Sequence, residues 1–484
     1  MTDFRHAAAR SFAAALVFAL ALPVVARSQN AEEPVVLPTP APMPSMSTTP
    51  IPYPAYGPAA PDVVQLVPHK GVPPEITLQQ AVAMAVVLSP AFATERAQYD
   101  AIRAKYGAEQ SALFPSVDVV ASATRLYGFQ INNTGTGTNT GSSNPTEFKA
   151  DAILQQLIYD GGRVIAAIKS ARSANIAGNE TLLRQLQTLE RSVSTAYYAV
   201  LEANATIDSS ATLVREFEIQ ERSVRAQINS GAAARSDLAN AQFQTAQARN
   251  TLVTAQGQAI GAQSTFATTI GLDADTEVVP QPVPPDTTTT VPSYRKSVTQ
   301  GFLMRPDYLA AQNTEYSAEY GLQYARGAHY PSLVANGDLG ESRITGQERT
   351  FQGAQQLGAT LTIPIFDQGL TNYNVAVAAS QLDQAKAGLV QTRLQVESDV
   401  RTAVAGLVSA RASAVQAQSE VTSSRVALDA AQAQYRVGTA TVVDVTTAEA
   451  NLATAQAAYI TAIYNVHNAV ETYNFAVGLS DLHL

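Results

Sequence analysis

The chain of 484 residues contains no cysteine and no tryptophan. Without cysteine there is no disulfide framework, no thiolate metal site and no lipidated N-terminal cysteine. Charged residues make up only 15% of the chain, well below the roughly 25% of a typical soluble domain. The formal net charge is −9, and Lys and Arg do not cluster, so no nucleic-acid partner is expected, because phosphate binding requires clustered positive charge.

Residues that could carry catalysis are also scarce. No two histidines have the spacing of metal ligands, so no metal site is expected; they are His6, His69, His329, His467 and His483. The stretch "GTGTNTG" has no helix after it and is interpreted as a loop instead of a phosphate-binding turn. No nucleophile-elbow motif is present. We therefore expect neither an enzyme nor a cofactor.

The N-terminal region has the pattern of an export signal. Arg5 and Arg10 precede the apolar run "SFAAALVFALALPVVA", which is shorter than the ~20 residues of a membrane-spanning helix. Residues 1–26 are therefore predicted to be a cleaved signal peptide. Residues 27–74 are rich in proline, which favours an extended, flexible leader. Ordered structure is expected from about residue 75, where "TLQQAV" has the spacing of a helix capping box.

The rest of the chain is an internal duplication, the feature that most constrains the fold. Near their starts the two copies align at an offset of 216, and further on at 207; the matched pairs are Pro90 with Pro306, Pro115 with Pro331, Asp160 with Asp367, Gly231 with Gly438, and Asp237 with Asp444. The difference falls in the loop "NNTGTGTNTGSSN" of the first copy, which is expected to face solvent. We assign a first repeat to 75–270, a linker to 271–298 and a second repeat to 299–484. Each repeat is predicted to contain one helix, a β-hairpin and two long helices.

Heptad spacing predicts that the long helices form coiled coils. From Leu182 to Ile228, apolar residues follow an almost unbroken four-three spacing, and a strict heptad repeat implies left-handed supercoiling. A helix from 161 to 229 would be roughly 100 Å long at ~1.5 Å per residue. Such a helix requires a rod or a tube instead of a compact globule.

Two shorter segments alternate between apolar and polar residues, as β-strands with one buried face do. Leu357, Ala359 and Leu361 alternate with glycine and threonine, and "EFKADAILQQL" behaves likewise. Runs of this length suit membrane-spanning barrel strands, although an amphipathic hairpin on a soluble core has the same pattern. Four strands per chain cannot close a barrel, since about eight is the smallest number known. Three chains would supply twelve.

Several motifs resemble the TolC family of outer-membrane efflux and secretion channels. They are "LIYDGGR", "RPDYLAAQ", "PIFDQG" and above all "YRVGTATVVDVTTAEANLATAQAAY" from Tyr435. The resemblance covers residues 75 to 480. It implies a mainly α fold with a transmembrane β-barrel: a homotrimer whose 12-stranded barrel continues into a 12-helix coiled-coil periplasmic tunnel, with 271–298 as an equatorial linker.

The same resemblance implies location, function and partners. The channel would lie in the cell outer membrane, in contact with its lipid, with the tunnel extending into the periplasm. It would be a passive exit duct of a tripartite efflux pump or a type I secretion system, opened by an iris-like movement of its periplasmic tip. Its partners would be a periplasmic adaptor (membrane fusion) protein and an inner-membrane transporter of the RND or ABC type. The cargo is not predicted.

Residue by residue, the resemblance places the gate at the two helix breaks. Asp444 matches the family's pore constriction, and Asp237, Ser236 and Tyr435 match its gating contacts. The turns that would receive the adaptor contain Gly231, Gly438 and Thr439. Two positions depart from the pattern: Ala440 stands where some members have a gating arginine, and Thr447 stands where some have a second aspartate.

Simpler interpretations of these residues stay open. Asp237 and Asp444 can be helix caps or dipole partners, the two glycines can be helix terminators, and Tyr435 can be a core residue of the coiled coil. Two rival functions also remain. A periplasmic coiled-coil adaptor would need compact β-rich domains beside its hairpin, and a secreted pore-forming toxin would insert hairpins into foreign membranes.

Overall fold

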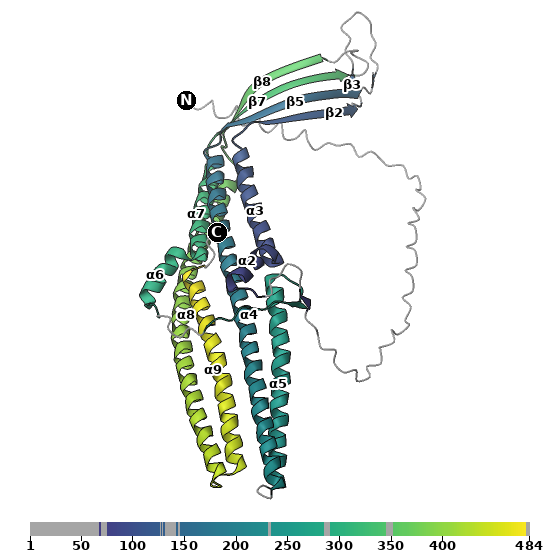
Figure 1. Cartoon of the computed structure of the whole chain (residues 1–484). Helices are drawn as coiled ribbons and strands as arrows, with labels where there is room; N and C mark the ends of the chain where they lie inside the picture. The colour runs from purple at the N-terminus through teal and green to yellow at the C-terminus, as the bar shows by residue number, and fades with distance from the viewer. Residues whose placement is uncertain are drawn as a thin grey trace, which may run out of the picture. The chain divides into compact units, whose positions relative to one another are not determined.

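The computed structural model describes residues 67–68, 75–125, 127, 129–130, 142–143, 146–230, 234–284, 291–344 and 352–480. The predicted signal peptide 1–26, the leader 27–74 apart from 67–68, the loop 132–144 apart from 142–143, and Gly231 lie outside the described residues. Figure 1 shows the arrangement of the elements. No helix among the described residues is long and apolar enough to cross a membrane.

Each repeat begins with two helices where the sequence predicted one. The first repeat has α2 (Leu78–Leu88) and α3 (Pro90–Ser111), and the second has α6 (Tyr294–Met304) and α7 (Pro306–Gly327). The single-helix prediction was wrong because a proline disfavours helical backbone at the residue before it. Ser89 and Arg305 are accordingly extended, and each serves as the N-cap of the helix that follows. Helix α6 also starts inside the segment assigned to the linker 271–298.

The long helices are duplicated with the same length in both repeats. Helices α4 (Arg163–Asn229) and α8 (Leu370–Arg436) have 67 residues each, which corresponds to roughly 100 Å. Helices α5 (Arg235–Ile270) and α9 (Val442–Val477) have 36 residues each. Both bounds of α8 and of α9 are those of α4 and α5 moved by 207. The offset of 207 between the two repeats, found in the sequence, is therefore also the offset between their long helices in the structure. In Figure 1, α5 runs beside α4, and α9 runs beside α8.

The aspartates of the "LIYDGGR" and "PIFDQG" motifs cap the long helices. Asp160 accepts hydrogen bonds from the backbone N–H groups of Gly162 at 3.1 Å and Val164 at 2.7 Å. Asp367 binds Gly369 and Thr371 in the same way, at 3.0 and 2.7 Å. A carboxylate satisfies the free N–H groups of a helix start and is favoured there by the helix dipole.

The hairpins of the two repeats join into one antiparallel sheet. Its strands are β2 (Ser116–Arg125), β5 (Thr146–Tyr159), β7 (Ser332–Ile344) and β8 (Gln352–Thr362), in the order β2-β5-β7-β8. Two minor pairs accompany it: β1 (Val67–Pro68) with β6 (Thr276–Glu277), and β3 (Phe129–Gln130) with β4 (Ser142–Ser143). Among the described residues, strands β2 and β8 each pair on one side only.

The register of the sheet separates a polar face from an apolar one. Asp151 lies opposite Gly340, and Gln155 lies opposite Asn336. The other face carries apolar side chains that are well exposed: Val117 at 67%, Val119 at 79%, Leu339 at 61% and Leu357 at 87%. The period-two pattern of the sequence is thus confirmed, and nothing in the described part of the chain covers the apolar face of the sheet.

The apolar core lies where the short helices pack on the long ones. The largest cluster joins α2, α4, α5 and the chain after α5, around fully buried Ile76, Val193 and Phe266. Its counterpart in the second repeat joins α6, α8 and α9 around Val396 and Val400. Smaller clusters continue down each hairpin. The largest clusters thus lie at mid-length, and smaller ones continue toward the hairpin tips.

Candidate functional site at the helix-hairpin tips

The turn between α8 and α9 is built by Gly438 and Thr441. Gly438 has φ +78°, a left-handed conformation that glycine adopts at little cost, and Thr439 donates its backbone N–H to the carbonyl of Gln434 at 2.9 Å. Thr441 then caps α9. Gly438 and Thr439 are both exposed at the end of the hairpin.

Asp444 completes the cap of α9 and keeps an exposed carboxylate. Its Oδ2 accepts hydrogen bonds from the backbone N–H and the hydroxyl of Thr441, both at 2.7 Å, while its own N–H donates to the Thr441 hydroxyl at 3.3 Å. These hydrogen bonds lower the pKa of Asp444, because they stabilise the charged form. The capping role is present, and it holds an ionised carboxylate at the surface of the tip.

The turn between α4 and α5 is similar in its described part. Asp237 accepts a hydrogen bond from the backbone N–H of Ala234 at 3.1 Å and lies in the first turn of α5. Alanine at the cap position cannot return a side-chain hydrogen bond, so this cap is weaker than that of α9. Ser236 is exposed beside it.

Tyr435 joins the two tips. Its hydroxyl donates a hydrogen bond to Oε1 of Gln227 in α4 at 2.8 Å, and its ring packs beside Leu428 and Val445 in the α8–α9 cluster. Burial and the nearby Asp237 carboxylate raise the pKa of Tyr435, so the phenol is neutral and able to donate at neutral pH. Core packing and an inter-hairpin contact therefore coexist at this residue.

The structure places Tyr435 near enough to Asp237 for its carboxylate to act on the phenol, and it joins Tyr435 to Gln227 by a hydrogen bond. Asp444 lies on the neighbouring turn and is bound to Thr441 of its own cap. Gln227 was not singled out from the sequence, because it lies 208 positions from Tyr435 and meets it only through the packing of α8 against α4. Nothing in its local pattern distinguishes it from the other glutamines of α4.

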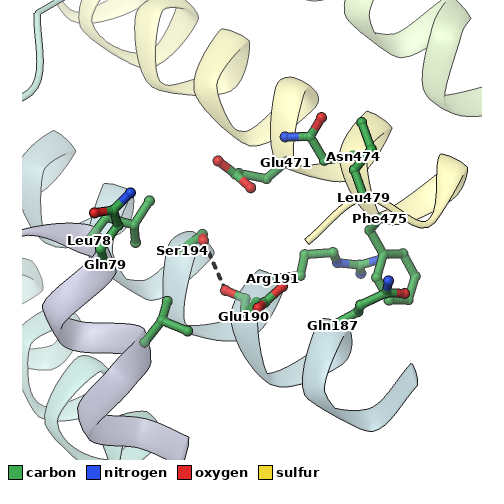
Figure 2. Close-up of a pocket in the computed structure, with 11 residues that line it drawn as sticks. Leu78, Gln79, Gln187, Glu190, Arg191, Ser194, Glu471, Asn474, Phe475 and Leu479 are labelled. Carbon is green, nitrogen blue, oxygen red and sulfur yellow. Dashed lines mark hydrogen bonds between the residues drawn. The ribbon is translucent and has the colours of Figure 1, made fainter. Parts of the chain in front are cut away.

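Far from the tips, the upper end of α9 is tied to α4. Arg184 donates to the Phe475 carbonyl at 2.8 Å, and Gln187 donates to the Gly478 carbonyl at 2.9 Å. The Arg184 guanidinium also lies 3.5 Å from the centre of the Phe475 ring, a cation–π contact. Figure 2 shows Gln187 and Arg191 of α4 beside Phe475 of α9, with α2 closing the crevice through Leu78.

A buried network of ion pairs also links the helices near the upper end of α9. Arg305 is 1% exposed and forms ion pairs with Asp307 at 2.6 Å and with Asp399 of α8 at 2.9 Å. Arg184 reaches Asp307 from α4 at 3.6 Å. Burial alone would raise the pKa of Asp307, but Arg305 and Arg184 outweigh it and hold that pKa below its usual value. The arginine and aspartate of "RPDYLAAQ" therefore join three helices at mid-length.

One buried carboxylate was missed by the sequence analysis. Glu449 of α9 is 6% exposed, although a signal was available, because it falls between Val445 and Leu452 at the four-three spacing of the apolar seam. A charged residue at a coiled-coil core position departs from the pattern.

Two long helical hairpins that continue from a sheet with one exposed apolar face define the class of tubular outer-membrane channel subunits. The chain matches the family described as "Outer membrane efflux protein" over residues 81–272 and 302–479, one segment for each repeat. It therefore belongs to the outer membrane efflux protein family. It is an outer-membrane channel with a helical part in the periplasm, and not the adaptor or the toxin considered above.

Individual relatives agree with this assignment. The outer membrane protein TolC of Escherichia coli (strain K12) is 24% identical over 415 residues, covering 80% of this chain and 79% of TolC. The outer membrane efflux protein BepC of Brucella suis is 23% identical over 315 residues, covering 65% of this chain and 68% of BepC. The crystal structure of the Campylobacter jejuni CmeC outer membrane channel has the same fold, with a TM-score of 0.72 at 19% identity over 85% of this chain and 89% of that one.

Proposed function

We propose that three copies of this chain form a continuous duct, with a closed 12-stranded barrel in the outer membrane and a 12-helix tunnel in the periplasm. The sheet supports this proposal: its apolar face is exposed, and no strand that the structure describes pairs with the outer edge of β2 or of β8. In a bilayer such edges must be paired, because lipid offers no hydrogen bonds. Pairing β8 of one copy with β2 of the next closes the barrel.

The duct is passive and receives its cargo from other proteins. A periplasmic adaptor would dock at the tips, where Gly438 and Thr439 are exposed, and an inner-membrane transporter of the RND or ABC type would supply the energy. Membership of the efflux family supports this arrangement, as a tripartite pump or as a type I secretion system. No enzymatic step is part of the proposal.

The tips form the gate. The α8–α9 hairpin is held firmly at its upper end by Arg184, Gln187 and Arg305, whereas the hydrogen bond between Tyr435 and Gln227 joins the hairpins at the lower end. A hairpin fixed at one end and lightly held at the other can swing outward with little loss of contact. Repeated by threefold symmetry, Asp444 would place three ionised carboxylates around the pore and favour cations.

The single observation that carries the pore assignment is the exposed, ionised carboxylate of Asp444. The test is single-channel recording of the purified full-length channel in planar bilayers, with Asp444→Asn beside wild type. Asparagine keeps an oxygen for the Thr441 cap and removes the charge. We expect lower cation selectivity and weaker block by divalent cations.

The matched control is Asp429→Asn, which removes an exposed carboxylate from α8. This variant should conduct as wild type does. If Asp444→Asn left selectivity and divalent block unchanged, Asp444 would not line the constriction. Absence of a heat-modifiable trimer from outer-membrane fractions would refute the assembly itself.

A further inference from the structure

A buried acidic residue lies between the two helical hairpins. Glu449 of α9 is 6% exposed, and its Oε2 has no hydrogen-bond partner in the described part of the chain. Burying an ionised carboxylate without a partner is costly, so such a group tends to take up a proton instead. This carboxylate is not needed for the cap of α9, which Thr441 and Asp444 complete.

The charges around Glu449 do not compensate it. Burial and then the like charge of Glu216, an exposed residue of α4, raise the pKa of Glu449 to about 7. Other charged side chains lie at a similar height along these helices. Glu218 of α4 is paired with Arg249 of α5 at 2.7 Å. Arg215 of α4 and Arg425 and Asp429 of α8 are exposed to solvent. Across the described residues, no cation acts on Glu449 strongly enough to offset Glu216.

Glu449 is also well placed to affect the gate. It lies five residues beyond Asp444 on α9 and below the level at which Arg184 and Gln187 fix the upper end of that helix. Beside it, a groove of about 380 Å³ opens between α4, α5 and α9, lined by Phe217 and Ala450 among others. The hairpins are loosely packed here, so a small change in their attraction can separate them.

We propose that Glu449 and Glu216 form a proton-sensitive joint between the two hairpins, in which protonation of Glu449 holds the hairpins together and its ionisation loosens them. This inference rests on the proposed gating movement, in which α8 and α9 swing away from α4 and α5. It adds to that movement a control by the pH of the compartment around the tips.

The direction of the pH dependence follows from the raised pKa. In the closed joint Glu449 titrates near 7, whereas once exposed it would titrate near its ordinary 4.5. The closed joint therefore binds the proton more tightly, and its advantage is complete below pH 4.5 and lost as the pH rises to 7. From well below pH 4.5 to well above pH 7 the ratio of closed to open joints should fall by up to about 300-fold, the ratio of the two acid constants, and between pH 5 and pH 8 it should fall by about 70-fold.

The experiment measures the distance between the tips directly. Because the chain has no cysteine, Ser230→Cys and Val437→Cys at the two helix ends allow specific spin labelling of the full-length protein. Labelled chains are diluted into unlabelled ones so that pairs within one chain dominate. We expect the separated population to grow between pH 5 and pH 8.

Glu449→Gln, which imitates the protonated form, should keep the tips together across this whole range. Glu216→Gln should weaken the pH response, because it removes the like charge. Glu420→Gln, which neutralises an exposed carboxylate of α8, is the control and should behave as wild type.

A pH response that persists in Glu449→Gln, or an equal loss in Glu420→Gln, would overturn the proposal. The measurement does not depend on conduction. A channel that fails to conduct would refute the proposed function while leaving this readout intact, and a conducting channel with a pH-independent tip distance would refute the joint alone.

Discussion

The hydrogen bond between Tyr435 and Gln227 gives the sharpest prediction about the gate. Tyr435→Phe removes the hydroxyl and keeps the ring against Leu428 and Val445. Because a neutral intramolecular hydrogen bond contributes about 1 kcal/mol, the open fraction of a single tip should rise about fivefold. If the three tips of a trimer open together, the three lost hydrogen bonds add to about 3 kcal/mol, and the ratio of open to closed channels should rise on the order of 100-fold.

The assay is the open probability of single channels in planar bilayers. Gln227→Leu should have a similar effect, and the double variant should add little to either one, because both single changes remove the same interaction. Tyr459→Phe is the matched control, since Tyr459 packs between α8 and α9 in a different cluster and its hydroxyl is not part of the tip contact.

Two results would refute this reasoning. If Tyr435→Phe left the open probability at the wild-type value, the hydrogen bond would not hold the tips. If the effects of Tyr435→Phe and Gln227→Leu were fully additive, the two residues would act separately and the contact would not be the closing element.

Two further predictions concern the fixed upper end of the hairpins. Arg305→Met should lower the free energy of unfolding by about 3–5 kcal/mol, because it leaves two aspartates without their buried partner; Arg393→Met, in an exposed pair with Glu397, should cost less than about 1 kcal/mol in the same denaturant titration. Gly478→Ala should destabilise by about 1–3 kcal/mol because of its φ of +81°, and its new Cβ would lie 2.8 Å from the backbone of Met304 and Arg305. Gly388→Ala, with open space around it in α8, should be neutral or stabilising, and a loss of stability equal to that of Gly478→Ala would contradict the argument.

The sequence predicted the large elements because their signals are local and repeated. The heptad seam of α4 and the matched offset in α8 fixed two helices of 67 residues each, and alternation along β5 and β8 marked the strands. The division of the first helix at Pro90 was missed, although the proline that disfavours helical backbone at Ser89 was visible in the sequence.

The site was only partly predictable, for a different physical reason. Tyr435 and Asp237 came from a family resemblance, whereas Gln227 and Glu216 are polar residues on the surface of α4 that acquire a role only when α8 and α9 pack beside it. Contacts of this kind depend on the rotation of one long helix against another. A single sequence does not encode that rotation in any local pattern.

The magnitudes of the two tip interactions decide which one controls closure. The Tyr435–Gln227 hydrogen bond favours the closed joint by about 1 kcal/mol per chain. Ionised Glu449 disfavours it by about 3 kcal/mol per chain, from a pKa raised from 4.5 to about 7 at about 1.4 kcal/mol per unit. Above neutral pH the carboxylate therefore outweighs the Tyr435–Gln227 hydrogen bond, and closure must come from other contacts between α9 and α4, such as the hydrogen bond from Thr461 to Glu202 at 2.8 Å. Below neutral pH the hydrogen bond is no longer opposed, so mutation of Tyr435 and mutation of Glu449 act on one equilibrium from opposite sides.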